Sequence, residues 1–175
     1  MGPARSEADF EAFYSASSRR LLGHVYAMVG DLAEAEDALQ EAYARAWQRW
    51  GRVASYEDPE AWVRTVAYRI AVSSWRRAAS RLRAHKRGAR PEEEPGASPD
   101  RLALVAALSE IPAEQRRAIV LHHLVGLSVE EIAHETGAPA GTVKSRLARG
   151  RRALAGHVSE YADEDQEAET YVRVR

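Results

Sequence analysis

The sequence predicts an all-α protein of two small helical domains joined by a flexible linker, the second of them a helix-turn-helix domain. Three observations predict this class. Apolar residues recur at the i, i+3, i+4 spacing of amphipathic helices along most of the chain. Residues 85–98 are rich in proline and charge and poor in apolar side chains, which is typical of a linker. Toward the C-terminus, a helix-stop signal lies a few residues before a helix-start signal, which indicates two helices and a short turn.

The first predicted domain covers residues 7–84 and contains three helices. Apolar residues indicate the first, at Phe10, Phe13, Leu21, Leu22, Val25 and Met28. Asp31 follows Gly30 and is expected to cap a second helix that runs toward Trp50. Asp58 followed by Pro59 predicts the start of a long third helix. We expect the inward stripe of this third helix at Trp62, Val66 and Ile70.

The second predicted domain covers residues 99–157. Pro99 and Pro112 mark the starts of two helices, which carry Leu102, Val105, Leu108, Ile119, Leu121, Leu124 and Val125. Ser128 and Glu131 form a capping box, and Gly137 can supply a left-handed C-cap before Pro139 opens the last helix. We expect the acidic residues 158–175 after that helix to be disordered.

The formal net charge of −1 conceals charged blocks of opposite sign. Residues 61–91 carry nine basic and no acidic residues, and residues 139–158 carry five basic and no acidic residues. Residues 159–175 hold six acidic residues against two arginines. This asymmetry predicts two basic surfaces on an otherwise acidic protein, a pattern that fits local binding of a polyanion.

Several function classes are excluded or disfavoured by composition. Cysteine is absent, which excludes disulfides and cysteine-ligated metals. No apolar run approaches the ~20 residues of a membrane span, so we expect a cytoplasmic protein. His122 and His123 are adjacent and cannot share one helix face as metal ligands. No catalytic constellation stands out, and we expect no enzyme activity, no metal site and no cofactor.

The basic run in the last predicted helix divides into faces on a helical wheel. Val143, Leu147 and Leu154 fall on one side, which we expect to be packed. The opposite side is expected to contact base edges in a DNA major groove through Thr142, Ser145, Ala148 and Arg149. Phosphate contacts are expected from Lys144, Arg146, Arg151 and Arg152. A basic helix alone is more often a solvated surface, but the capped helix and the turn before it favour DNA.

The other basic segment interleaves Trp62, Tyr68 and Trp75 with arginines. Aromatic faces stack on unpaired bases while arginines hold the backbone of a single strand. The signal is weak by itself, because a tryptophan at helical spacing, such as Trp62, is more often a core residue.

Three blocks in order resemble the conserved blocks of bacterial extracytoplasmic-function (ECF) sigma factors. They are "AEDALQEAYARAW" (35–47), "EAWVRTVAYRIA" (60–71) and "IPAEQRRAIVLHHLVGLSVEEIAHETGAPAGTVKSRLARGRRAL" (111–154), and the resemblance covers about residues 7–156. It implies an N-terminal domain that binds the β′ clamp helices of RNA polymerase and opens the −10 promoter element. It also implies a C-terminal domain that reads the −35 element.

The resemblance further implies roles for individual residues. Polymerase contacts would come from Asp37, Gln40, Glu41, Arg45 and Gln48. The −10 element would meet Ser55 and Tyr56 in a base-holding loop, with Arg64, Arg69, Arg76 and Arg77 facing the DNA. The implied partners are the RNA polymerase core with its β′ and β subunits and promoter DNA, with an anti-sigma factor as a further candidate.

The chain departs from the family pattern at a few positions. Arg69 and Ser73 stand where many members carry Asn and Asp, and Ala148 stands where bulkier residues are common. The promoter sequences therefore remain open. The main alternative is a helix-turn-helix regulator that binds an operator without core polymerase, and a helical adaptor that binds only protein is more distant. The acids of 159–175 suggest a further hypothesis, in which they compete with DNA for the basic helix.

Overall fold

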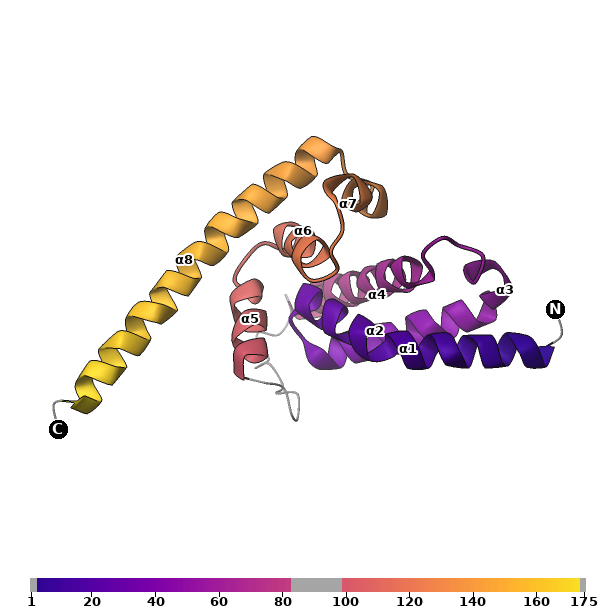
Figure 1. The fold of residues 1–175 in the computed structure, drawn as a ribbon, viewed down its shortest axis with the longest axis horizontal. Helices are drawn as coiled ribbons and strands as arrows, with labels where there is room; N and C mark the ends of the chain where they lie inside the picture. The colour runs from indigo at the N-terminus through magenta and orange to yellow at the C-terminus, as the bar shows by residue number, and fades with distance from the viewer. Residues whose placement is uncertain (1–2, 83–98, 174–175) are drawn as a thin grey trace. The chain divides into compact units, whose positions relative to one another are not determined.

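The structure, a computed structural model, describes the backbone of residues 3–82 and 99–173 and the surroundings of side chains 6–74 and 102–156. Every element in these ranges is an α-helix, and none is long and apolar enough to cross a membrane. The chain divides into two compact units, Met1–Ser98 (unit 1) and Pro99–Arg175 (unit 2). The all-α, two-domain class is thus confirmed (Figure 1), while the predicted linker lies outside the described residues.

Unit 1 contains α1 (Pro3–Val29), α2 (Leu32–Gln48), α3 (Trp50–Val53) and α4 (Pro59–Leu82). The helices α1, α2 and α4 pack against one another (Figure 1). Asp31 caps α2 as predicted and accepts a hydrogen bond from the backbone N–H of Glu34 at 2.8 Å. Asp58 likewise accepts one from the N–H of Ala61 at 2.9 Å. The short helix α3, which the sequence pattern does not indicate, leads the chain from α2 into the loop before α4.

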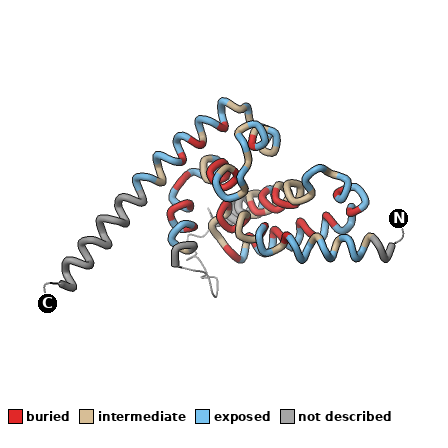
Figure 2. Tube along the Cα trace, viewed as in Figure 1, coloured by how far each residue is buried: buried red, intermediate tan, exposed pale blue. Residues whose placement is uncertain are grey.

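The core of unit 1 combines large residues of α1 with small residues of α2 and α4. Leu21, Val25 and Met28 of α1 are fully buried (Figure 2). The buried faces of α2 and α4 are rich in alanine, at Ala35, Ala38, Ala42, Ala46, Ala67 and Ala71. Small side chains allow helix axes to approach closely, so the unit is held by tight helix-to-helix packing.

The buried stripe of α4 differs from the predicted one. The structure buries Val63, Ala67 and Ala71, whereas the predicted Trp62, Val66 and Ile70 are half-buried. The physical reason is that α4 packs against both α1 and α2, and close approach favours the face that carries alanine. Hydrophobic periodicity cannot separate two apolar stripes that lie next to each other on one helix.

A cluster of aromatic rings lies where α1, α2 and α3 meet. The ring of Phe10 lies 5.1 Å from those of both Trp47 and Trp50, measured between centroids. The hydroxyls of Tyr43 and Ser17 share a buried hydrogen bond of 2.7 Å. Burial raises the pKa of Tyr43 to about 12, and the hydrogen bond with Ser17 only partly offsets this rise.

Unit 2 contains α5 (Pro99–Ser109), α6 (Ala113–His123), α7 (Val129–Thr136) and α8 (Ala140–Arg173). Helix α8 lies against α5, α6 and α7. The predicted caps are confirmed: Ser128 and Glu131 form a reciprocal capping box, and Gly137 is left-handed at φ 70°. Both devices act within one turn of chain, which is why they are readable from sequence.

The core of unit 2 is small and closely packed. Val143 and Leu147 of α8 are buried as predicted, with Ile119, Leu121 and Ile132 from the neighbouring helices. Helices α8 and α6 approach closely at Gly150, because a Cβ placed on it would lie 2.8 Å from Cγ1 of Ile119. Leu124, at the C-cap of α6, is 43% exposed.

Helix α8 continues without a break through Arg173. This helical backbone differs from the disordered tail that its composition predicts for residues 158–175. Two effects explain a helix here: Ala and Glu are strong helix formers, and extending an existing helix carries no nucleation cost.

Candidate nucleic-acid interface

A helix, a tight turn and a second helix follow one another in unit 2, as α7, Gly137 with the residues beside it, and α8. The capping box fixes the start of α7, and Gly137 ends it. Thr136 ties the turn together, since its hydroxyl donates to Ile132 O at 2.7 Å and accepts from the N–H of Ala138 at 3.4 Å. Because α7 packs on both α6 and α8, the first turns of α8 are held in place by the neighbouring helices of unit 2.

The two faces of α8 separate as the wheel predicts. Val143 and Leu147 of the predicted packed side are buried, as is Gly150, whereas Leu154 of that side is half-buried. The exposed side chains comprise all four residues assigned to bases and three of those assigned to phosphates, namely Thr142, Ser145, Ala148, Arg149, Lys144, Arg151 and Arg152. Ser145 also donates to Gly141 O at 3.0 Å, which leaves its oxygen able to accept. The exposed face therefore carries small side chains toward its N-terminal end and positively charged side chains beyond them.

Two of the cations assigned to phosphates have partners inside unit 2. Arg146 is half-buried and pairs with Glu114 of α6 at 2.9 Å. Arg151 donates from Nε to Nε2 of His123 at 3.2 Å. Arg146 therefore helps to hold α8 against α6, whereas the side chains of Lys144, Arg149 and Arg152 form no hydrogen bond or ion pair with another described residue.

The adjacent histidines contact each other, with ring centroids 4.7 Å apart, but differ in burial. Nδ1 of the half-buried His122 lies 2.8 Å from Leu127 O, so this ring forms a hydrogen bond to the chain just after α6. His123 is exposed, and desolvation, His122 and Arg151 together lower its pKa below the ordinary 6.5. Because the neutral ring can accept the Arg151 hydrogen bond and the protonated ring cannot, this contact weakens in acid.

The polar face of α2 is open to solvent. Every residue assigned there to polymerase binding is exposed, namely Asp37, Gln40, Glu41, Arg45 and Gln48. Glu41 and Arg45 form an ion pair of 2.7 Å one helical turn apart. An exposed pair of this kind contributes only about 0.3–0.5 kcal/mol to stability, so both groups remain usable by a partner.

The residues assigned to the −10 element have different environments. Ser55 is exposed, Tyr56 is half-buried, and Arg69 is exposed on α4. Arg64 is only 2% exposed, which corrects its assignment to a DNA-facing surface. Its position one turn before Tyr68 places it on the buried side of α4, a consequence of the shifted stripe. The side chains of Arg76 and Arg77 lie outside the described residues.

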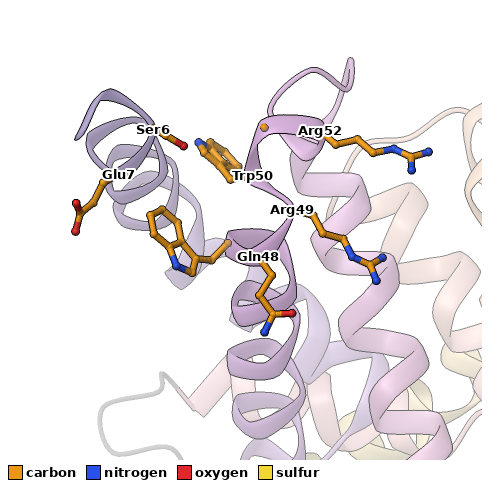
Figure 3. A pocket seen from close by; sticks show the side chains of 8 residues that line it. Ser6, Glu7, Gln48, Arg49, Trp50 and Arg52 are labelled. Atoms are coloured by element: carbon orange, nitrogen blue, oxygen red, sulfur yellow. The ribbon is translucent and has the colours of Figure 1, made fainter. Parts of the chain in front are cut away.

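Sequence reasoning missed two concave surfaces, because each is made by several helices. An open hollow of about 720 Å³ lies where α1, α2 and α3 meet (Figure 3). Trp47 on its wall is 45% exposed. A smaller apolar groove of about 250 Å³ lies in unit 2 between α5, α6 and α8. Its lining includes Leu104, Leu124 and Leu154. No sequence pattern could have predicted the exposure of Trp47, since an aromatic residue at helical spacing is expected to be buried in the core.

Comparison with known proteins assigns each of the two units to a protein family. Residues 13–81 match the family described as sigma-70 region 2, and residues 101–154 match the family described as sigma-70, region 4. These matches, together with the helix-turn-helix of unit 2, place the chain in the class of RNA polymerase sigma factors.

Individual relatives narrow this class. The ECF RNA polymerase sigma factor SigL of Mycobacterium tuberculosis is 35% identical over 161 residues, which cover 87% of this chain and 91% of SigL. The RNA polymerase sigma-E factor of Streptomyces coelicolor is 32% identical over 174 residues, covering 94% of this chain and 93% of that factor. This chain belongs to the ECF sigma factor family.

The fold is shared with a solved sigma factor. RpoE of Bartonella quintana, in complex with the anti-sigma factor NepR, superposes with a TM-score of 0.74 at 24% identity, covering 86% of this chain and 97% of RpoE. Membership of the family makes the protein a promoter-recognising sigma factor, and the operator-binding regulator is not favoured.

Proposed function

We propose that unit 2 reads the −35 element through the exposed face of α8. The observation that carries this proposal is the separation of α8 into a buried apolar side and an exposed side with Thr142, Ser145, Ala148 and Arg149. A major groove accepts a helix whose leading residues are small, and an arginine can pair bidentately with guanine. Lys144, Arg151 and Arg152 flank this face for phosphates, while Arg146 contributes through its pairing with Glu114.

Unit 1 binds the polymerase core through the polar face of α2, with the clamp helices of β′ as its partner. This exposed face combines acids, amides and Arg45, so it is complementary to a polar helical surface that places charges of the opposite sign against them. RNA synthesis then belongs to the polymerase, and the chain itself carries no catalytic step.

Opening of the −10 element uses the loop before α4. Ser55 and Tyr56 hold an unpaired base there, and Arg69 meets the DNA backbone from α4. Extruding a base costs a few kcal/mol, which contacts in a shaped loop can offset. Arg64 is left out of this role because its side chain is buried.

The apolar groove of unit 2 is the proposed contact for the β subunit. Leu104 and Leu124 on its rim are 41% and 43% exposed, and an apolar groove of this size fits the apolar face of a single helix. An anti-sigma factor is a further proposed partner class, since the related RpoE fold was solved with one bound. Such a partner would act by covering one of these surfaces.

The decisive experiment mixes the purified chain with RNA polymerase core. Gel filtration is expected to show a stoichiometric complex, and the complex is expected to initiate at promoters found by mapping transcription starts after induced expression. Glu41→Lys should weaken the complex, because it reverses a charge within the proposed contact face. Glu36→Lys is the matched control, because Glu36 is also exposed on α2 but lies about 120° from the centre of that face. A chain that forms no complex with core refutes the proposal.

A further inference from the structure

Helix α6 contacts two arginines of α8, one near each of its own ends. Glu114, in the first turn of α6, pairs with Arg146 at 2.9 Å. His123, in the last turn, accepts a hydrogen bond at its Nε2 from Nε of Arg151 at 3.2 Å. Successive residues of a helix turn by about 100°, so Arg146 and Arg151 lie about 70° to either side of the buried stripe of α8. The two contacts are therefore on opposite flanks of the helix proposed to enter the major groove.

The two contacts differ in their effect on charge. The carboxylate of Glu114 opposes the charge of Arg146 and competes with a phosphate for its guanidinium. A neutral imidazole beside Arg151 accepts one N–H and leaves the positive charge intact. Nη1 and Nη2 of Arg151 form no hydrogen bond or ion pair with another described residue. Helix α6 thus retains Arg146 within unit 2 and leaves the charge of Arg151 available to a phosphate.

The hydrogen bond to His123 also restricts the orientation of Arg151. A guanidinium is planar and rigid, so a bond made at Nε determines the direction in which the rest of the group points. That bond leaves Nη1 and Nη2 together as a fork at the end of the side chain. Such a fork matches the bidentate geometry in which arginine binds a phosphate.

The ring of His123 is itself held in place by its neighbours. It meets the ring of His122 edge to face, with centroids 4.7 Å apart and planes inclined at 77°. His122 is in turn anchored by its hydrogen bond of 2.8 Å with Leu127 O. His123 and Arg151 both line the apolar groove of unit 2, and desolvation is the main reason that the pKa of His123 is below its usual value. The ring is therefore kept in the neutral form, which is the form that can accept from Arg151.

We propose that His123 is a positioning residue for DNA binding by unit 2, because it orients the guanidinium of Arg151 toward a phosphate without cancelling its charge. The inference rests on the proposed function, since it adds a second residue to the phosphate contact proposed for Arg151. Ordering an arginine side chain on binding costs affinity, and a side chain that is already oriented avoids part of that cost. The contribution is the same for every sequence, because a phosphate carries no base identity.

The test measures binding of the full-length chain to a labelled DNA duplex by fluorescence anisotropy at about pH 8, where His123 is neutral because its pKa is below 6.5. Arg151→Ala should weaken binding and lower the slope of log affinity against log salt concentration by about 1, the value for one phosphate. His123→Ala should weaken binding about 2- to 10-fold and keep the wild-type slope, because the charge of Arg151 remains. His123→Gln should restore most of the affinity, since its amide oxygen can accept the same hydrogen bond.

A double-mutant cycle distinguishes positioning from a direct contact of His123 with DNA. If His123 acts through Arg151, the variant with both His123→Ala and Arg151→Ala binds no more weakly than Arg151→Ala alone. His134→Ala is the matched control, because His134 is an exposed histidine of α7 and its effect should add to that of Arg151→Ala. The proposal is overturned if His123→Ala causes the same loss with and without Arg151, or if it causes no loss in the wild type. Thermal melts by circular dichroism give the temperature range in which every variant is folded, and affinities are compared within it.

Gel filtration with core polymerase separates this proposal from the proposed function. If the wild type forms the core complex but Arg151→Ala or His123→Ala binds the duplex as the wild type does, the proposed function stands and the positioning role is overturned. If His123 and Arg151 are coupled in the cycle but no core complex forms, the positioning role stands and the proposed function fails.

Discussion

Gly150 provides the sharpest test of how unit 2 is packed. The residue is buried in α8, and a Cβ placed on it would lie 2.8 Å from Cγ1 and 3.2 Å from Cδ1 of Ile119 in α6. Cγ1 is held close to the backbone of a β-branched side chain, so it cannot swing aside as the end of a flexible chain would. Gly150→Ala must therefore move Ile119 or separate α8 from α6.

Two opposing terms set the size of the effect. Replacing a helical glycine with alanine stabilises a helix by about 0.5–1 kcal/mol. Overpacking a core by one methyl group costs about 1–3 kcal/mol. We expect the packing term to win, leaving Gly150→Ala less stable than the wild type by up to about 2 kcal/mol. For a small domain each 1 kcal/mol lowers Tm by about 4–8 °C.

The assay is thermal unfolding followed by circular dichroism, with Gly156→Ala as the matched variant. Gly156 lies in the same helix, is exposed, and a Cβ placed on it would meet nothing within 4 Å. It therefore reports the helix-propensity gain without the packing cost. Gly150→Ala is expected to melt below the wild type and Gly156→Ala at or above it. Equal Tm values for the two variants would refute close contact between α8 and Ile119.

Three further predictions concern charge. Lys144→Ala is expected to weaken binding to all duplexes similarly and to lower the slope of log affinity against log salt concentration by about 1. Arg149→Ala should instead relax sequence preference. Anisotropy titrations against several −35 sequences measure both effects. Because the folded protein holds the pKa of His123 below 6.5, the unfolded chain binds more protons, and stability falls as pH drops below 6.5. His123→Gln should reduce that fall in melts at pH 7.5 and pH 5.5, and an unchanged pH dependence would contradict the assigned cause. In a continuous α8, Glu160, the first acid of the deleted segment, lies about 16 Å along the axis from Arg149 and about 12 Å from Arg152. Both separations exceed the ~8 Å Debye length of physiological salt, so deleting 159–175 should change −35 affinity less than twofold at that salt. A tenfold gain would instead show that the acids fold back onto the basic helix.

Features that depend on a few consecutive residues were predictable from the chain. The caps at Asp31, Ser128 and Gly137 lie where the sequence predicts them, because each is closed by a hydrogen bond or a dihedral angle within one turn. The division of α8 into a buried and an exposed face follows in the same way from helical geometry. The family assignment also came from sequence, since it depends on the order and spacing of motifs.

Only the tertiary structure decided which of two apolar stripes on α4 is buried, and with it that Arg64 is inside unit 1. It likewise decided that Arg146 pairs with Glu114, which lies in another helix, and that Trp47 is left half-exposed beside a hollow. The physical reason is common to all of these features. Burial and pairing depend on which surfaces of distant segments meet, and a local pattern specifies only which surfaces are available to meet.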